Sequence, residues 1–232
     1  MKRSQINQEI RWAKALLEKS NIKLPPFGYW TMQEWTSGER NIDIIKEVML
    51  GWDITDYGKD RFNELGAILF TLRNGSLKDS SIGTPYAEKL ILLKEGQRLP
   101  IHYHASKTED IINRAGGVLA IKLYNSLENG DVDYESKVTV DMDGVKYVFA
   151  PGEEIDIMPG NSITLRPFVY HLFWAKAGCG DLVCGEVSSI NDDNTDNYNA
   201  EDVSRFSTVE EDESILHPLC NEYTTVLEDK NV

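Results

Sequence analysis

GQRLPIHYHASKTEDIINRAGG, residues 96–117, contains two of the four histidines of this 232-residue chain, one residue apart. Pro100 near its start makes the stretch strand-like, and residues i and i+2 of a strand face the same side. His102 and His104 therefore project together, whereas on a helix they would diverge by about 200°. Glu109 follows five residues after His104 and can add an oxygen ligand from the next turn or strand. The stretch predicts a metal site on a β-structure.

The composition of the chain limits its partners. It is 41% hydrophobic, enough for a substantial core, and its formal net charge is −14. This charge repels nucleic-acid phosphates and anionic membranes, and the basic residues are scattered, so we expect neither partner. The N-terminus is charged throughout, which argues against a signal peptide or a spanning helix and favours the cytoplasm. Three cysteines without CxxC spacing are expected to be reduced thiols.

Residues 1–65 are expected to form a mostly helical N-terminal extension. Apolar residues recur at helical spacing over 4–19, which predicts an amphipathic helix that ends before KLPP, residues 23–26. Thr31–Glu34 has the form of a capping box, and NIDIIKEVML at 41–50 indicates another helical stretch.

Over residues 66–190, short apolar runs such as AILFTLRNG and KLILLKEG alternate with turn residues. This pattern predicts a succession of β-strands. Asn74-Gly75 and Asp143-Gly144 are tight-turn dipeptides, and the second has the alternating flanks of a hairpin. An antiparallel barrel or sandwich follows. Residues 191–232 are acidic, but LHPLCNEY within them favours a segment folded over the barrel rather than a disordered tail. We expect one domain over residues 1–232.

The spacing around the two histidines is more specific than the pair itself, since such pairs also occur by chance on half-exposed strands. From Gly96 there are five residues before His102, one before His104, four before Glu109 and six before Gly116. This spacing resembles the first signature motif of the cupin superfamily. The resemblance implies a mostly β fold, a cupin jelly-roll β-barrel with the N-terminal helices packed on its outside.

The second cupin motif is matched in part. It places a histidine eleven positions after a glycine, and Gly160 and His171 have this separation. Pro167 lies one place later than usual, and the expected second glycine and the following asparagine are missing. His171 is therefore a weaker match than the ligands of the first motif.

Longer stretches narrow the resemblance. HYHASKTEDIINRAGG, PGEEIDIMPGNSITLRPFVYHLFWA and GEVSSINDDNTDN are similar to the D-lyxose isomerases, and the likeness covers most of the chain. It implies a homodimeric sugar isomerase whose Mn²⁺ is bound by His102, His104, Glu109 and His171. Three imidazoles and a carboxylate also suit Fe²⁺, Co²⁺, Ni²⁺ and Zn²⁺, so the donor set by itself does not select the metal.

The expected reaction is aldose–ketose isomerisation, of D-lyxose to D-xylulose and also of D-mannose to D-fructose. A six-coordinate ion with four protein ligands keeps two positions for O1 and O2 of an open-chain sugar. Chelation acidifies the C2 proton and leads to an enediol intermediate, and a carboxylate is the natural carrier of that proton to C1. A metal-assisted hydride shift remains the alternative.

Three residues are candidate catalytic groups. Glu186, on a late strand, and Glu201, in the segment expected over the barrel mouth, are alternative proton carriers. Lys107, between the ligands of the first motif, is a candidate for polarising O1 or for orienting the substrate. Each has an alternative interpretation as a solvated surface charge, since Lys and Glu are mostly exposed.

Three further residues are candidate substrate contacts. Lys89 interrupts an apolar strand, and Phe173 shares a strand face with His171. Arg205 is a candidate for binding a sugar hydroxyl, or else pairs with neighbouring acids. His217 matches no motif and is expected to be structural.

Two other functions fit the cupin motifs. An iron-dependent dioxygenase uses the same ligands and leaves positions for dioxygen. A non-catalytic sugar-binding cupin is the other alternative, although four intact ligands argue against it. Isomerisation requires no oxygen, which separates it from the first of these.

Overall fold

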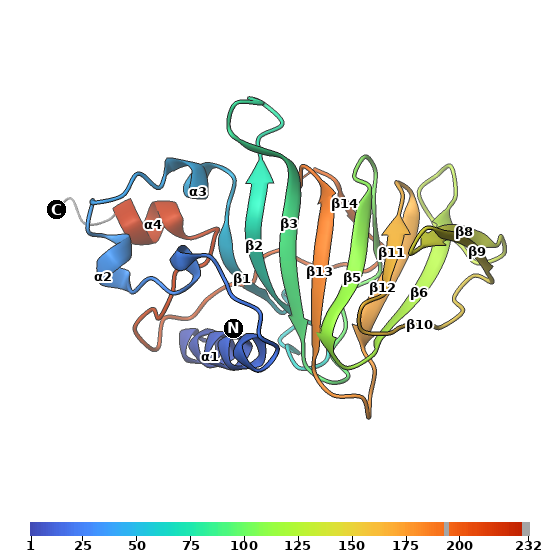
Figure 1. The fold of residues 1–232 in the computed structure, drawn as a ribbon, viewed down its shortest axis with the longest axis horizontal. Helices are drawn as coiled ribbons and strands as arrows, with labels where there is room; N and C mark the ends of the chain where they lie inside the picture. The colour runs from blue at the N-terminus through green and yellow to red at the C-terminus, as the bar shows by residue number, and fades with distance from the viewer. Residues whose placement is uncertain (193–194, 229–232) are drawn as a thin grey trace.

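Two antiparallel sheets curl around a shared apolar core in the computed structural model, which describes residues 1–192 and 195–228 (Figure 1). Residues 193–194 and 229–232 of the expected acidic segment lie outside the described residues. One sheet has the strand order β1-β2-β3-β13-β5-β11-β8-β9 and the other β10-β6-β12-β4-β14, with β7 paired to β6. The predicted mostly β fold is confirmed. No described helix is both long and apolar enough to cross a membrane.

The strands of the eight-stranded sheet are β1 (Gly51–Thr55), β2 (Ala67–Gly75), β3 (Gly83–Leu93), β13 (Leu182–Ser189), β5 (Glu109–Gly116), β11 (Ser162–Leu165), β8 (Val138–Met142) and β9 (Val145–Phe149). Those of the second sheet are β10 (Ile155–Ile157), β6 (Leu119–Ser126), β12 (Val169–Ala175), β4 (His102–His104), β14 (Asn197–Asn199) and β7 (Val132–Asp133). The helices are α1 (Arg3–Lys19), the 3-10 turn η1 (Pro26–Gly28), α2 (Met32–Trp35), α3 (Asp43–Glu47) and α4 (Tyr223–Glu228).

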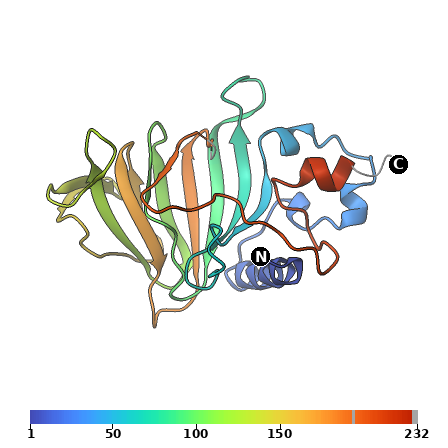
Figure 2. The same cartoon turned by 180° about the vertical axis from the view of Figure 1, so that it is seen from behind.

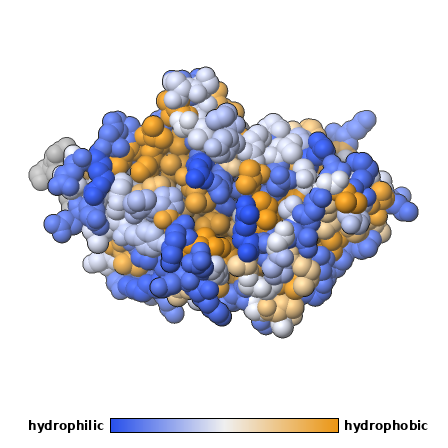
Figure 3. Space-filling view, viewed as in Figure 1, coloured by the Kyte–Doolittle hydropathy of each residue, from blue (hydrophilic) through white to orange (hydrophobic). Residues whose placement is uncertain are grey.

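The eight-stranded sheet is apolar on both faces. In β3, Ile91 and Leu93 point into the core between the sheets, while Leu90 and Leu92 point to the outer face. The outer face packs against the apolar side of α1, so the core extends beyond the space between the sheets. In Figure 3, apolar atoms also reach the surface over the middle of this outer face. Burial of both faces explains why LILL, residues 90–93, is a continuous apolar run rather than an alternating one.

The N-terminal extension contains the helices α1, α2 and α3 and the turn η1, joined by turns and loops, and one strand. The predicted helix at 4–19 is observed as α1, and Thr31 and Glu34 form both hydrogen bonds of a capping box at the start of α2. Residues 51–55, however, form β1, which pairs with β2 at the edge of the eight-stranded sheet. All five residues of β1 are buried, so the strand is stabilised by tertiary packing that helical periodicity cannot reveal.

The two predicted tight turns have different outcomes. Asp143 and Gly144 join β8 to β9 with φ of 48° and 81°, as a two-residue hairpin turn requires. The prediction at Asn74-Gly75 is wrong, because both residues belong to β2 and Gly75 pairs with Gly83. The Asn74 amide instead donates to two backbone carbonyls, which accounts for an asparagine inside a strand.

The acidic C-terminal segment returns across the molecule to the N-terminus. Figure 2 shows it running in front of the strands between β14 and α4. Its acids then bind α1: Asp212 accepts from the backbone N–H and the hydroxyl of Ser4, and Glu211 and Glu222 both bind Arg3. The negative charge of this segment is therefore partly neutralised by the guanidinium of Arg3 in the first turn of α1.

Replacing Arg3 with Met is expected to lower the free energy of unfolding by about 2 to 3 kcal/mol. The Arg3 side chain has no exposed surface, and its removal leaves Glu211 and Glu222 facing each other without their shared cation. Arg11→Met is the matched control, because Arg11 is 56% exposed and lies 3.9 Å from Glu213. Urea denaturation measures both variants, and equal losses would contradict the role of Arg3.

Candidate active site

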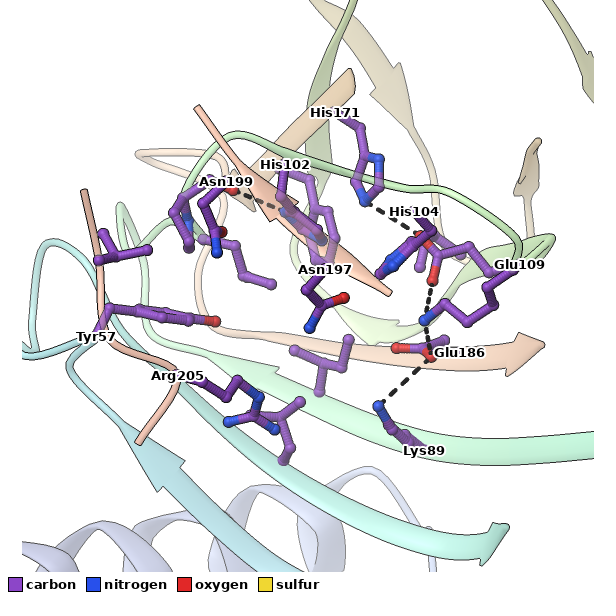
Figure 4. A pocket seen from close by; sticks show the side chains of 18 of the residues that line it. Tyr57, Lys89, His102, His104, Glu109, His171, Glu186, Asn197, Asn199 and Arg205 are labelled. Carbon is purple, nitrogen blue, oxygen red and sulfur yellow. Dashed lines mark hydrogen bonds and ion pairs between the residues drawn. The ribbon is translucent and has the colours of Figure 1, made fainter. Parts of the chain in front are cut away.

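A cavity of about 290 Å³ lies between the two sheets and contains most of the candidate residues (Figure 4). The six-stranded sheet supplies His102, His104 and His171. The eight-stranded sheet supplies Glu109 and its neighbours on β3 and β13. The predicted metal ligands therefore come from both sheets and meet where the sheets face each other.

The three histidines form one cluster. His102 and His171 are register partners on β4 and β12, and the ligand nitrogens of all three lie within 4.8 Å of one another. The Nδ1 of His102 donates to the carbonyl oxygen of Pro100 at 2.9 Å, and the Nδ1 of His171 donates to that of Val169 at 3.1 Å. These bonds leave the Nε2 lone pairs of both rings available for a ligand. Burial, with the two neighbouring imidazoles, holds the pKa of His102 well below its ordinary value, so the ring is neutral.

Glu109 faces this cluster from the opposite sheet. Its Oε1 lies 3.4 Å from the Nε2 of His104 and 3.1 Å from the Nε2 of His171, and Glu109 is only 2% exposed. Neither Oε1 nor the Nε2 of His171 has a hydrogen-bond partner among the described residues. Lone pairs of a carboxylate and an imidazole thus face each other in a buried site, which is unfavourable unless a cation lies between them. Three nitrogens and one oxygen fit a divalent transition metal.

A chain of charged side chains extends from this site. The Nζ of Lys107 lies 2.8 Å from Oε2 of Glu109 and 2.9 Å from Oε1 of Glu186. The Nζ of Lys89, the register partner of Glu186, lies 3.8 Å from the same Oε1. All four groups are buried. The interpretation of Lys89, Lys107 and Glu186 as solvated surface charges is therefore excluded.

The carboxylates of Glu109 and Glu186 are both held in the ionised form. Burial raises the pKa of Glu109, but the Lys107 ammonium, together with His104 and His171, outweighs burial, and the pKa lies well below its ordinary value. Burial likewise raises the pKa of Glu186, and Lys107 and Lys89 together bring it below its ordinary value. Glu186 is thus a buried carboxylate that can accept a proton at neutral pH.

Of the remaining candidate residues, Phe173 and Arg205 belong to the cavity lining and Glu201 does not. Phe173 and Arg205 line the cavity, and Arg205 binds the buried carboxylate of Asp53 at 2.5 Å. Glu201 is not among the described residues that line the cavity. Its carboxylate accepts two hydrogen bonds from Arg98, at 2.8 and 3.1 Å, and one from the backbone N–H of Ile101.

Three polar residues of the cavity lining were not anticipated from the sequence. Asn197 and Asn199 lie opposite His104 and His102 in the register of β14 with β4, and Tyr57 lies at the other end of the cavity (Figure 4). The alternation of asparagines in NYN would have been a strand signal. It was not recognised because the surrounding NDDNTDNYNAED is typical of a loop.

His217 lies outside the cluster, as expected for a structural histidine. Its Nδ1 donates to the carbonyl oxygen of Trp30 at 2.8 Å, its Nε2 lies 3.2 Å from the Nζ of Lys14, and its ring stacks on Trp52. Burial, with the Lys14 ammonium, lowers the pKa of His217 to about 4. The imidazole of His217 therefore binds a proton less readily in the folded protein than in the unfolded chain.

Stability is accordingly expected to depend on His217 between pH 6.5 and pH 4. Within this window the unfolded chain binds the proton and the folded chain does not, so the free energy of unfolding falls as the pH falls. Allowing for partial solvent screening, the loss is about 2 kcal/mol. Denaturation of the wild type and of His217→Gln across this range measures it, because other titrating groups cancel. Parallel profiles would contradict the expectation.

Known proteins resemble this chain over nearly its full length. A family model described as D-lyxose isomerase matches residues 1–223. A Serratia proteamaculans protein named D-lyxose/D-mannose isomerase is 41% identical over 224 residues, and an Escherichia coli protein of the same name is 39% identical. Both alignments cover 96% of this chain and 98% of the relative.

Solved structures share the fold. The L-ribose isomerase of an Acinetobacter species, in complex with L-ribose, aligns with a TM-score of 0.61 at 15% identity, over 90% of this chain and 98% of that one. At this identity the likeness concerns the fold. The family match and the identity to the two named relatives confirm the resemblance to the D-lyxose isomerases that the longer stretches of sequence indicated. The chain belongs to the D-lyxose isomerase family.

Proposed function

We propose that this chain is a metal-dependent aldose–ketose isomerase that converts D-lyxose to D-xylulose and D-mannose to D-fructose. The observation that carries the proposal is the pair of facing lone pairs on Glu109 and His171, beside a buried, ionised Glu186. The sugars follow from the names of the two relatives. The cavity of about 290 Å³ has room for one open-chain monosaccharide.

His102, His104, Glu109 and His171 would hold the ion. When bound there, a divalent metal supplies Lewis-acid polarisation of the carbonyl and hydroxyl oxygens at C1 and C2. We propose Mn²⁺, on the family resemblance, while the donor set suits Fe²⁺, Co²⁺, Ni²⁺ and Zn²⁺ as well.

Glu186 is the proposed proton carrier. Its contacts with Lys107 and Lys89 are made through Oε1, and Oε2 is turned toward the middle of the cavity (Figure 4). As an ionised carboxylate it removes the proton from C2, becomes a carboxylic acid, and returns the proton to C1 of the enediol, while the hydroxyl proton of O2 moves to O1, so that C1 becomes the alcohol and C2 the ketone. Lys107, between Glu109 and Glu186, donates a hydrogen bond toward O1 and stabilises negative charge there.

The wall opposite Lys107 is proposed to hold the rest of the sugar. Asn197 and Asn199 offer amide donors and acceptors, Arg205 offers a guanidinium positioned by Asp53, and Phe173 supplies an apolar surface. Lys89 lies behind Glu186 and is proposed to keep it ionised and in place. We assign Glu201 to fastening the C-terminal segment, since its carboxylate is engaged by Arg98 and Ile101.

A homodimer and a cytoplasmic location are further proposals that come from the family resemblance. Sedimentation of the purified protein at several concentrations tests the dimer, and a monomer at all concentrations would contradict it. Fractionation of the source cells tests the location.

An aldose panel under nitrogen tests the proposed function. The metal-free protein, prepared by chelation, is expected to be inactive, and Mn²⁺ is expected to restore ketose formation from D-lyxose and D-mannose. The same rate in air and under nitrogen excludes a dioxygenase. Normal metal binding without turnover of any aldose would contradict the isomerase and favour the sugar-binding alternative.

A further inference from the structure

Two of the three clustered histidines are oriented by their own strands. His102 and His171 each donate Nδ1–H to the backbone carbonyl two residues earlier. Such a bond selects the tautomer and directs Nε2 at a ligand. His104 has no bond of this kind, and its buried Nδ1 has no hydrogen-bond partner among the described residues. The orientation of His104 therefore needs another explanation.

The group that faces the Nδ1 of His104 is the carboxylate of Asp196, which is 8% exposed and comes from the C-terminal segment. Its Oδ2 lies 3.9 Å from Nδ1, which is longer than a hydrogen bond and can be closed by a small rotation of either side chain. Asp196 directly precedes β14, where Asn197 is the register partner of His104. Backbone pairing thus holds Asp196 beside this histidine.

The same carboxylate holds the turn that carries Lys107. Its Oδ1 accepts from the backbone N–H of Ser106 at 2.8 Å and from the Ser106 hydroxyl at 2.7 Å. Its Oδ2 accepts from the backbone N–H of Lys107 at 3.1 Å. One side chain thus contacts both a metal-ligand strand and the turn after it, and it belongs to a segment about 90 residues further along the chain.

We propose that Asp196 is a positioning residue that accepts a hydrogen bond from Nδ1–H of His104, and so orients the Nε2 of His104 toward the metal while fixing the turn that presents Lys107. The proposal rests on the metal centre of the proposed function and deepens it. It gives the acidic C-terminal segment a defined task, because the site is completed only when this segment has paired with β4. A carboxylate–histidine pair of this kind also makes the imidazole a stronger donor to the metal.

Nitrogen NMR of the metal-free protein at neutral pH tests the tautomer directly. The chain has only four histidines, so single substitutions assign every ring nitrogen. In the wild type, His104 is expected to carry its proton on Nδ1. In Asp196→Asn the His104 signals are expected to shift toward a mixture of tautomers. Asp202→Asn is the matched control, because Asp202 is an exposed acid on the same segment, and it is expected to leave them unchanged.

Metal affinity provides a second measurement that needs no sugar. Competition of Mn²⁺ against a chromophoric chelator is expected to show 10- to 100-fold weaker binding by Asp196→Asn, as is typical of partners behind metal ligands, and unchanged binding by Asp202→Asn. A wild-type His104 protonated on Nε2 would overturn the proposal even if Asp196→Asn failed to fold, and so would an unchanged affinity in a folded Asp196→Asn. A wild type that binds no divalent metal would instead overturn the metal centre itself, while the NMR result still decides how His104 is oriented.

Discussion

Glu109→Ala is expected to lose both bound metal and isomerase activity. The substitution removes the only oxygen among the four proposed ligands and leaves the Lys107 ammonium, formerly 2.8 Å from Oε2, facing the cation site without its carboxylate. Loss of a ligand and repulsion by Lys107 act together, so the affinity for Mn²⁺ should fall by at least about 100-fold. Because metal polarisation is worth several kcal/mol, turnover should fall by at least about 1000-fold.

Asp110→Ala is the matched control for this prediction. Asp110 is the next residue on β5, has its side chain on the opposite face, and accepts a hydrogen bond from Thr164. It is expected to keep both metal and turnover. Metal analysis after dialysis, together with initial rates on D-lyxose, measures both variants. Full turnover by a metal-free Glu109→Ala protein would contradict the proposed centre.

Glu186→Gln is expected to keep its metal and lose turnover by about 100- to 10,000-fold, the range associated with removal of a general base. Glutamine preserves the shape of the side chain, and its amide oxygen can still accept from Lys107. It cannot accept a proton from C2. The expected signature is therefore a loss in kcat with little change in metal content.

Glu88→Gln is the control here, because Glu88 lies on the neighbouring strand as the register partner of Val187 and pairs with Arg73 away from the cavity. It should leave kcat unchanged.

Turnover in D₂O separates the two possible mechanisms. Deuterium at C1 of the ketose indicates a proton carried by a side chain, whereas its absence, combined with full activity of Glu186→Gln, would indicate a hydride shift and remove Glu186 from the reaction.

Strand alternation allowed much of the site to be predicted. His102 and His104 share a face because they are two residues apart, and the structure directs both rings into the cavity. Lys89 belongs to the same alternating set as Ile91 and Leu93, so its inward direction also follows from local pattern. A charged residue in the inward set of an apolar strand is a signal that sequence reasoning can use.

Pairings between distant segments could not be predicted. The bonds of Asp196 to Ser106 and Lys107 join residues about 90 positions apart, and nothing in the local pattern around Asp196 distinguishes it from its acidic neighbours. The same limit applies to Glu201, whose partner Arg98 is far away along the chain. Asp196 and Glu201 both lie in a segment whose composition is typical of a loop.

The sequence by itself determined the mostly β fold and, through its resemblance to known motifs, the family, and it predicted the four proposed metal ligands, because motif spacing and strand alternation are local properties of the chain. Only the tertiary structure decided which acids meet which bases: that Glu186 lies between two lysines, that Glu201 binds Arg98, and that β1 and β14 are strands. These outcomes depend on sheet register and on burial. Both are set by the free energy of packing the whole chain, to which any one segment contributes only a part.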